Sequence, residues 1–398
     1  MDKPLPTFDN RHADFDVTED FTRFNQRDDV FCRSFWDPTV KSGRSGLFYQ
    51  SYRTPLKEWK KVEGFTQRDY ALRNAAWQVT DIFAELKEDE DRREGFLDEY
   101  TVLRDGPDEK IEIDSPEDMA TEIKHVARTF GADLVGITDF DERFVYTHKY
   151  SREREAEKPS ELPRGMTSVI VIAQSMDRDL IRTVPSALSG TATGLGYAHD
   201  TVVLLALTQY ILNLGYRAVA SMNDTALAIP YAIKAGLGEY GRHGLVITEE
   251  FGPRVRFGKI FTDLPLAHDV PKRFGVKEFC EECRACTDAC PAKAIPGGEP
   301  STTVHNISNI QGVKKWTVDG EKCFRFWANQ NSDCSICVRV CPYNRDFSTW
   351  GNRLWRRLAG TRLRGLMSRL DKRQGRGERM KPSSWWPARS RPEITTSE

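Results

Sequence analysis

Eight cysteines crowded into a short stretch constrain this chain more than any other feature. The sequence of 398 residues contains nine cysteines, and eight of them fall between Cys280 and Cys341. A small secreted protein held by disulfides spreads its cysteines along the whole chain, whereas a tight cluster in a large chain indicates metal binding in a reducing compartment. The ninth, Cys32, stands alone in an apolar stretch, and we interpret it as a buried structural thiol.

The spacing of the eight cysteines identifies the kind of metal centre. The first motif reads Cys280-x2-Cys283-x2-Cys286-x3-Cys290-Pro291, which is the bacterial run for a [4Fe–4S] cluster. The second motif has Cys323, then ten residues, then Cys334-x2-Cys337-x3-Cys341-Pro342. Structural zinc is the alternative, because CxxC pairs also bind zinc. A third cysteine at the same spacing and the Cys-Pro endings favour two [4Fe–4S] clusters instead.

In paired motifs of this kind, the fourth cysteine of each motif ligates the cluster of the other motif. The rule predicts that the first cluster is held by Cys280, Cys283, Cys286 and Cys341. It predicts that the second cluster is held by Cys290, Cys323, Cys334 and Cys337.

The charge of the chain is unevenly distributed. The formal net charge is −1, but residues 351–398 contain thirteen Lys and Arg against four Asp and Glu. The body before them is therefore acidic, and the end of the chain is basic. A basic segment can contact an anionic membrane, a nucleic acid or an acidic redox partner, and beyond residue 371 its composition predicts disorder.

Composition shifts divide the chain into four parts. Residues 1–110 form an aromatic-rich N-terminal region that includes Trp36, Trp59 and Trp77, and residues 111–275 have an α/β pattern. Residues 276–347 form the cysteine domain, and residues 348–398 form the basic tail, with one short amphipathic helix expected over 350–370. No apolar run is long enough to span a bilayer, and the N-terminus shows neither a signal-peptide core nor a twin-arginine pair, so we expect a cytoplasmic location.

Local patterns predict the elements of residues 111–275. Ser115 followed by Pro116 is a helix start, and β-branched runs predict strands at 133–138, 168–173 and 216–220. A glycine loop over 190–196 is expected to precede a helix capped by Asp200, and strands 244–248 and 254–261 are expected to form a hairpin.

A dinucleotide fingerprint is excluded by its context. Gly236, Gly238 and Gly241 match G-x-G-x-x-G, but a helical stretch precedes them rather than a strand. Such glycines still permit close approach to a bulky cofactor, so we keep all three as candidate cofactor-binding residues.

Several segments together resemble one family. Residues 223–225, 235–242, 251–256 and 261–265, followed by the two cysteine motifs with Lys322-Cys323-Phe324-Arg325-Phe326-Trp327 and Cys341-Pro342-Tyr343-Asn344, are similar to reductive dehalogenases over roughly residues 115–350. Epoxyqueuosine reductase is a more distant relative.

The resemblance implies a fold, cofactors and residue roles. The fold would be α/β (α+β), a nitroreductase-like corrinoid-binding domain followed by a bacterial ferredoxin-like domain with two [4Fe–4S] clusters. The corrinoid would be bound without a histidine below the cobalt. By position, Tyr197 matches the proton donor, Arg256 its cationic support and Asn223 a substrate-orienting or hydrogen-bonding residue. Thr193 and Trp327 are weaker candidates for the pocket wall.

The implied reaction is reductive cleavage of a carbon–halogen bond of an organohalide. A separate electron donor, such as a ferredoxin, a flavodoxin or a reductase, would be required. One alternative is an epoxyqueuosine reductase-like enzyme acting on tRNA, for which Asp224 or Asp139 would be the acid. Another is a non-catalytic electron carrier or corrinoid-reducing partner. We do not expect nucleic acid to be the main partner, and Lys259 or Lys234 could take the place of Asn223.

Overall fold

A four-stranded antiparallel sheet lies at the centre of the computed structural model, which describes residues 16–53, 62–85, 102–151, 155–375 and 377–387. The order of the strands is β2(Leu134–Asp139), β5(Ser168–Ser175), β9(Val255–Thr262) and β6(Ala218–Ser221). The register pairs Ile170 of β5 with Ile137 on one side and Ile260 on the other. The three strands predicted for this region are therefore present, and the mixed α/β character is confirmed.

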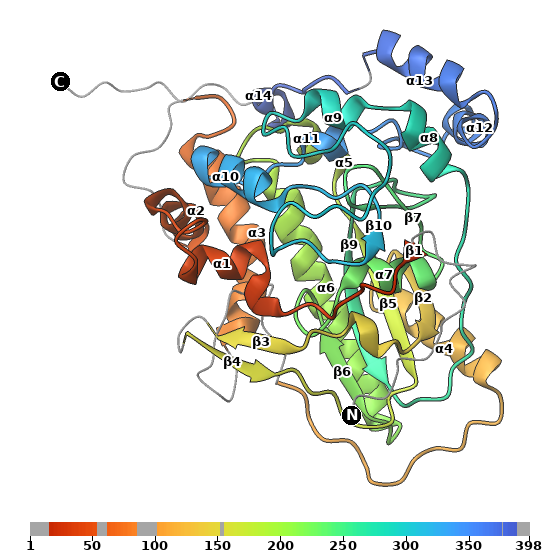
Figure 1. The fold of residues 1–398 in the computed structure, drawn as a ribbon. Helices are drawn as coiled ribbons and strands as arrows, with labels where there is room; N and C mark the ends of the chain where they lie inside the picture. The colour runs from red at the N-terminus through yellow and green to blue at the C-terminus, as the bar shows by residue number, and fades with distance from the viewer. Residues whose placement is uncertain (1–15, 54–61, 86–101, 152–154, 376, 388–398) are drawn as a thin grey trace.

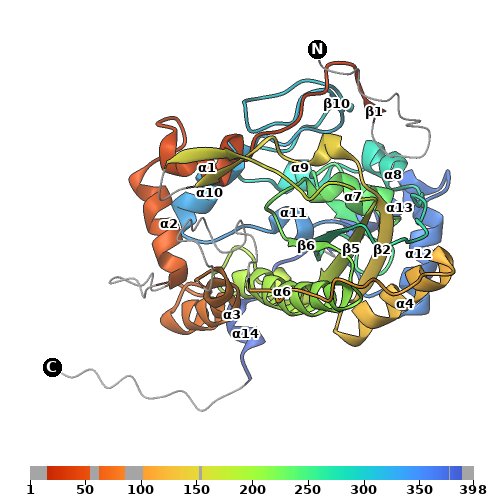
Figure 2. The same ribbon diagram turned by 90° about the horizontal axis from the view of Figure 1, so that it is seen from below.

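Helices cover both faces of this sheet (Figures 1 and 2). Alternate residues of β5 point to opposite faces, so Ile170 and Ile172 pack with α4(Pro116–Thr129) and α6(Gly190–Asn213). Val169 and Val171 pack on the other side with α7(Ala228–Lys234). Burial on both faces explains why β5 is a continuous β-branched run rather than an alternating one.

The remaining elements are short and surround this core. The other strands are β1(Asp16–Val17), β3(His148–Ser151), β4(Ala156–Pro159), β7(Glu239–Tyr240), β8(Val246–Ile247) and β10(Val313–Lys314). The other helices are α1(Val30–Trp36), α2(Gly43–Arg53), α3(Gln67–Glu85), α5(Arg178–Arg182), α8(Val276–Glu282), α9(Ala285–Ala289), α10(Gly320–Gln330), α11(Ile336–Arg339), α12(Trp350–Ala359), α13(Arg364–Arg373) and α14(Pro382–Trp385), with 3-10 turns at Gln26–Asp28 and Glu142–Phe144. As predicted, the side chain of Ser115 accepts a hydrogen bond at the start of α4.

Helix α6 corrects the expected glycine loop. Gly190, Gly194 and Gly196 lie inside the helix rather than before it, and Asp200 is an interior residue rather than a cap. The glycines serve close packing, because a side chain on Gly194 would collide with Trp77 of α3 and one on Gly196 with Arg256. Three glycines in seven residues resemble a loop in sequence, but the packing against α3 overrides their low helix propensity.

The carboxyl group of Asp200 is fully buried, and neither of its oxygens has a hydrogen-bond partner among the described residues. Burial raises its pKa well above 3.8, so folding favours the protonated form of the group over the ionised form. A raised acid pKa costs stability as the pH rises above 3.8. We expect Asp200→Asn to raise the melting temperature at pH 7 by at least about 2 °C and to have no effect below pH 4. Calorimetry at both pH values checks this, and an equal shift at the two values would contradict it.

The expected hairpin between residues 244–248 and 254–261 is wrong. β8 pairs with β7, whereas β9 pairs with β5 and β6. An isolated bridge between Thr248 and Gly252 closes the turn that connects the two segments. The residues around Gly252 do form a turn, but this turn leads from the β7–β8 sheet into the central sheet and does not form a hairpin.

The N-terminal region packs against the cysteine domain. β1 pairs with β10, and in the figures α1 and α2 lie beside α10 (Figures 1 and 2). The rings of Phe31 and Phe324 are 5.4 Å apart, and those of Phe48 and Phe324 are 5.7 Å apart. These aromatics therefore bury one another across a sequence separation of almost 300 residues. Trp59 lies outside the described residues.

The basic tail is more ordered than its composition predicts. Residues 350–370 contain parts of two helices, α12 and α13, instead of one. Further along, the Arg379 side chain donates to the carbonyls of Thr183 and Pro185, and Trp386 donates to Asp69 at 3.2 Å. Disorder beyond residue 371 is therefore wrong for 372–375 and 377–387, because arginine and tryptophan contacts fix the segment. Residues 388–398 lie outside the described part. No helix in the described residues has the length and apolar character to cross a membrane.

Candidate active site and cysteine centres

The fold brings the eight cysteines together in two groups of four. The thiols of Cys280, Cys283 and Cys286 help to raise the pKa of Cys341, although Cys341 belongs to the other motif. Likewise, Cys290 helps to raise the pKa of Cys323 and Cys334. Cys337 is influenced by Cys290, Cys323 and Cys334, and also by Cys286, so the two groups adjoin each other. The groups coincide with the crossed sets expected from the sequence, and the ligand assignment stays a prediction.

The chemistry of these thiols fits ligands of a positively charged centre. Burial raises the pKa of Cys286, Cys323 and Cys334 to about 12 and that of Cys341 well above its ordinary value. Unliganded thiolates are therefore disfavoured here, and coordination to iron would supply the compensating charge. Across the residues with described positions, no three Cys, His, Asp or Glu side chains are arranged to hold a single metal ion.

A cavity of about 570 Å³ lies beside the second group of cysteines. All four members, Cys290, Cys323, Cys334 and Cys337, line it. Its other walls come from the N-terminal region, through Phe21 and Phe31, and from the sheet domain, through Asn223 and Arg256. The cavity therefore lies where three parts of the chain meet, which is a common location for a ligand site.

Tyr197, Asn223 and Arg256 meet at one point. Tyr197 lies on α6, Asn223 follows β6, and Arg256 lies on β9, which is paired with β6. The amide of Asn223 donates to the Tyr197 hydroxyl oxygen at 2.6 Å, and the Arg256 guanidinium donates to the same oxygen. The guanidinium carbon also lies 4.2 Å from the Tyr197 ring centroid. The expected constellation is thus assembled from three elements.

This geometry has a chemical consequence. Two donors occupy the lone pairs of the Tyr197 oxygen, so its own proton must be directed elsewhere. The same two donors stabilise the phenolate after the proton leaves. Burial lowers the pKa of Arg256 to about 10, which still leaves the guanidinium charged at neutral pH. The arrangement is suited to proton donation.

Two residues that we did not predict complete this arrangement. The Trp77 ring lies 5.1 Å from the Tyr197 ring and fixes its orientation. Asp333 lines the cavity next to Cys334 and accepts hydrogen bonds from Thr193 at 3.0 Å and Tyr52 at 3.2 Å. Trp77 was visible in the sequence only as one of many aromatics. The position of Asp333 immediately before a cluster cysteine is a signal that could have identified it.

His243 is a third unpredicted residue in the cavity wall. Burial lowers its pKa to about 4, so the imidazole is neutral at pH 7. Its Nδ1 accepts from the backbone N–H of Leu245 at 3.3 Å, which leaves the proton on Nε2. Nε2 is buried and has no partner in the described parts of the chain. His243 therefore presents an unused donor rather than a free lone pair.

The residues expected to bind the cofactor differ in whether they line the cavity. Thr193 and Trp327 line the cavity. Gly236, Gly238 and Gly241 are not among the residues that line it. A side chain on Gly236 would collide with the carbonyl oxygen of Val270, and one on Gly238 with that of Ile247. These two glycines permit close packing of the protein on itself, and their role in cofactor binding stays a prediction.

The alternative acids and lysines lie away from the Tyr197 hydroxyl. Lys234 pairs with Asp139 at 2.8 Å, and neither residue lines the cavity. Asp224 is buried and accepts from the Met222 N–H at 2.7 Å. Lys259 is buried and donates to the carbonyl of Met222. Asp224 and Lys259 hold the turn after β6 in place, and this turn contains Asn223.

Two family models match the chain in succession. Residues 149–266 match the model of a reductive dehalogenase subunit, and residues 279–344 match that of a 4Fe-4S double cluster binding domain. The order of the two is the one that the sequence resemblance predicts. The resemblance to reductive dehalogenases is confirmed. The iron–sulfur part of the cofactor prediction is confirmed with it.

Individual reductive dehalogenases are similar over much of the chain. A tetrachloroethene reductive dehalogenase of Desulfitobacterium hafniense is 36% identical over 297 residues, which are 64% of this chain and 53% of that protein. One from Sulfurospirillum multivorans is 34% identical over 255 residues, which are 58% of this chain and 51% of that protein. The chain therefore spans about half the length of these curated relatives. An epoxyqueuosine reductase of Staphylococcus aureus is 26% identical over 267 residues, which are 60% of this chain and 68% of that protein.

The fold is also that of a solved reductive dehalogenase. The structure of a catabolic member superimposes with a TM-score of 0.74 and 23% identity, over 95% of this chain and 50% of that chain. The mixed α/β architecture described above is therefore shared with that protein.

Removing the charge of Arg256 tests its contact with Tyr197. We expect Arg256→Gln to lower turnover by about tenfold or more, because the phenolate would lose its cationic partner while one hydrogen-bond donor remains. Arg256→Lys should recover part of the loss. Steady-state kinetics with an artificial electron donor measures the turnover of both variants. If the Gln variant is as active as the Lys variant, the charge of Arg256 has no role in stabilising the phenolate.

Proposed function

We propose that this chain is a corrinoid- and iron–sulfur-dependent reductive dehalogenase. One observation carries the proposal: a single cavity is lined by the four thiols of one cysteine group and by Asn223 and Arg256, which bind the Tyr197 hydroxyl. The four thiols and the two residues that bind the Tyr197 hydroxyl thus border one space, and Tyr197 itself lies behind that lining. The similarity to tetrachloroethene reductive dehalogenases supports an organohalide as the substrate class.

The reaction consumes two electrons and one proton. The carbon–halogen bond breaks, a carbon–hydrogen bond forms and halide leaves. A separate electron carrier supplies the electrons one at a time through the two clusters. Tyr197 supplies the proton, and Asn223 and Arg256 hold the resulting phenolate until it is reprotonated. A corrinoid would supply the cobalt that attacks the carbon–halogen bond.

The cavity has the volume and the lining of a ligand site. Its volume of about 570 Å³ lies within the range of about 300–1,000 Å³ usual for ligand pockets. Its walls are mostly apolar, with the buried His243 Nε2 and the Arg256 Nε still without partners among the described residues. A corrin ring carries amide side chains around an apolar macrocycle, so such isolated donors are suited to it. His243 would bind such an amide rather than the metal, since its proton lies on Nε2.

The finer assignments belong to this proposal. Residues 111–275 would form a nitroreductase-like corrinoid domain, residues 276–347 a ferredoxin-like domain, and residues 1–110 a cover over the site. The N-terminal residues Phe21, Val30 and Phe31 in the cavity wall support the last assignment. A cytoplasmic location and a separate ferredoxin, flavodoxin or reductase as the electron donor are proposed on the sequence alone.

Epoxyqueuosine reduction is the second candidate, favoured by the similarity to that enzyme. It is less well supported, because Asp139 is paired with Lys234 and the Asp224 carboxylate accepts hydrogen bonds from the Met222 N–H and the Thr225 hydroxyl.

Metal analysis and two substrate assays test the proposal. The anaerobically reconstituted full chain is expected to retain about eight iron atoms and one cobalt after desalting with cobalamin. It should release chloride from tetrachloroethene with reduced methyl viologen and leave epoxyqueuosine-containing tRNA unchanged. Failure to retain cobalt overturns the corrinoid site, and conversion of the tRNA instead of the organohalide overturns the substrate class.

A further inference from the structure

The helices α12 and α13 cover the first group of cysteines on the side away from the cavity. Trp355 and Ala359 of α12 and Met367 of α13 pack in the same apolar cluster as Cys280, Cys283 and Cys341. Ser368 of α13 hydrogen-bonds the Cys283 sulfur. Figure 1 shows α12 and α13 beside α8, at the edge of the molecule. The two helices are therefore a layer between the first cysteine group and solvent.

The outer face of this layer is apolar at its centre. Five of the large hydrophobic side chains that are exposed lie here, namely Trp350 (72% exposed), Leu354 (37%), Leu363 (47%), Leu366 (52%) and Leu370 (38%). Their neighbours Trp355, Ala359 and Met367 face inward, so the helices are amphipathic with both sides partly apolar. Exposed apolar residues gathered in this way mark an interaction surface. We call this surface the α12–α13 face.

The α12–α13 face is also strongly basic. Residues 350–373 contain eight Lys and Arg and one acidic residue, Asp371. Asp371 is buried and paired with Arg345, so it does not offset the charge of the face. Arg353, Arg357 and Arg369 are exposed. None of these three side chains has an ion pair or a hydrogen bond with another residue of the described structure.

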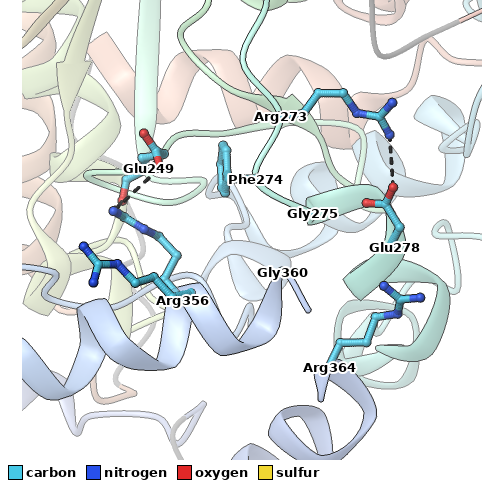
Figure 3. Close-up of a pocket in the computed structure, with 9 residues that line it drawn as sticks. Glu249, Arg273, Phe274, Gly275, Glu278, Arg356, Gly360 and Arg364 are labelled. Atoms are coloured by element: carbon cyan, nitrogen blue, oxygen red, sulfur yellow. Dashed lines mark hydrogen bonds and ion pairs between the residues drawn. The ribbon is translucent and has the colours of Figure 1, made fainter. Parts of the chain in front are cut away.

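A hollow of about 600 Å³ adjoins the face (Figure 3). Arg356 and Glu249 lie across it at 3.6 Å, and Arg273 pairs with Glu278 at 3.0 Å. Arg357 and Arg364 also line it and have no ion pair with any residue whose position is described. Two unpaired guanidinium groups in a hollow next to an apolar surface are suited to carboxylates on a partner.

We propose that the α12–α13 face is the docking surface for a small acidic electron-carrier protein. The inference rests on the proposed function, because only a reductive reaction requires electrons to enter at the first cluster. The face lies over that cysteine group, its charge is opposite to that of an acidic carrier, and it combines exposed apolar side chains with exposed arginines. Redox encounter complexes use small interfaces of this kind.

An anionic membrane is the competing occupant, since basic and apolar side chains also bind lipid surfaces. The hollow favours a protein, because a flat lipid surface cannot fill it. A carrier also has to approach a cluster closely, and this face provides the approach.

Charge reversal on α12 tests the proposal. Flavodoxin in its hydroquinone form serves as the probe, because its oxidation to the blue semiquinone reports each electron passed to the reconstituted chain. We expect Arg353→Glu combined with Arg357→Glu to lower the second-order rate constant at low ionic strength by about tenfold or more, with the difference disappearing in high salt. Arg44→Glu combined with Arg128→Glu is the matched control, since both arginines are exposed and lie on α2 and α4. This control should change the rate less than about twofold.

The readouts separate this inference from the proposed function. Flavodoxin oxidation measures electron entry alone, whereas chloride release with methyl viologen measures the dehalogenation reaction. The α12 variant should keep its chloride release with methyl viologen and its full iron content. The docking surface is overturned if the flavodoxin rate constant falls equally in the α12 variant and in the Arg44/Arg128 control. It is also overturned if the rate constant does not fall in the α12 variant. If the variant instead loses binding to phosphatidylglycerol vesicles and keeps its flavodoxin rate, the face belongs to the membrane and the proposal is also overturned.

Discussion

Tyr197→Phe is expected to abolish most dehalogenation while leaving the cofactors in place. The substitution removes only the hydroxyl group, whose oxygen accepts hydrogen bonds from Asn223 and Arg256. Loss of a positioned acid typically costs at least about a hundredfold in rate. The ring, which packs on Trp77, is retained, so the fold and the cavity should be unchanged. Turnover with reduced methyl viologen, measured together with iron and cobalt content, checks this.

A matched substitution controls for the loss of a tyrosine hydroxyl near the cavity. The Tyr146 hydroxyl donates to the backbone carbonyl of Asn223 at 3.2 Å and not to Tyr197. Tyr146→Phe should therefore lower turnover much less than Tyr197→Phe does. If Tyr197→Phe turns over as fast as the unchanged protein, Tyr197 is not the proton donor and the chain is better described as an electron carrier.

Cys341→Ser is expected to remove the first cluster, although Cys341 belongs to the second motif. The fold groups Cys341 with Cys280, Cys283 and Cys286. Its loss should reduce the iron content from about eight to about four atoms per chain and stop turnover driven by a protein carrier. The remaining cluster lies beside the cavity, so its electron paramagnetic resonance signal should still show coupling to bound cobalt.

Cys290→Ser provides the reciprocal experiment. Cys290 belongs to the first motif, but it lines the cavity with the second group. Cys290→Ser should lose the electron paramagnetic resonance signal that is coupled to cobalt and keep the uncoupled signal of the first cluster. If each variant instead loses the cluster of its own motif, the crossed assignment is wrong for this chain.

The cysteine centres could be predicted from the sequence because ligand spacing is local and chemically strict. The crossed grouping also follows from the sequence, since it depends on the spacing rule and not on the surrounding fold. Tyr197, Asn223 and Arg256 could be proposed only through a resemblance. They lie on three elements whose meeting depends on the register of β6, β9 and α6.

The failures have a common physical cause. Gly190, Gly194 and Gly196 predict a loop by propensity, yet α3 and β9 pack so closely on α6 that a side chain at these positions would collide with Arg73, Trp77 or Arg256. The segment around Arg379 and Trp386 predicts disorder by composition, yet it is fixed by contacts with residues almost 200 and more than 300 positions away. His243 carried no pattern of its own, and the only signal for Asp333 was its place before Cys334. In each case a long-range contact decides the outcome, and a single sequence does not encode such contacts visibly.

The pairing of β1 with β10 bears on the order in which a ribosome delivers the parts of this protein. Val17 cannot find its partner Val313 until most of the chain has been synthesised, and Phe31 and Phe48 likewise wait for Phe324. Phe31 and Phe48 therefore lack this partner ring until Phe324 has been synthesised, which exposes them to aggregation. The cavity wall that they contribute closes last. Iron–sulfur clusters and a bulky cofactor can thus be inserted into a nearly finished polypeptide before its own N-terminus closes over them.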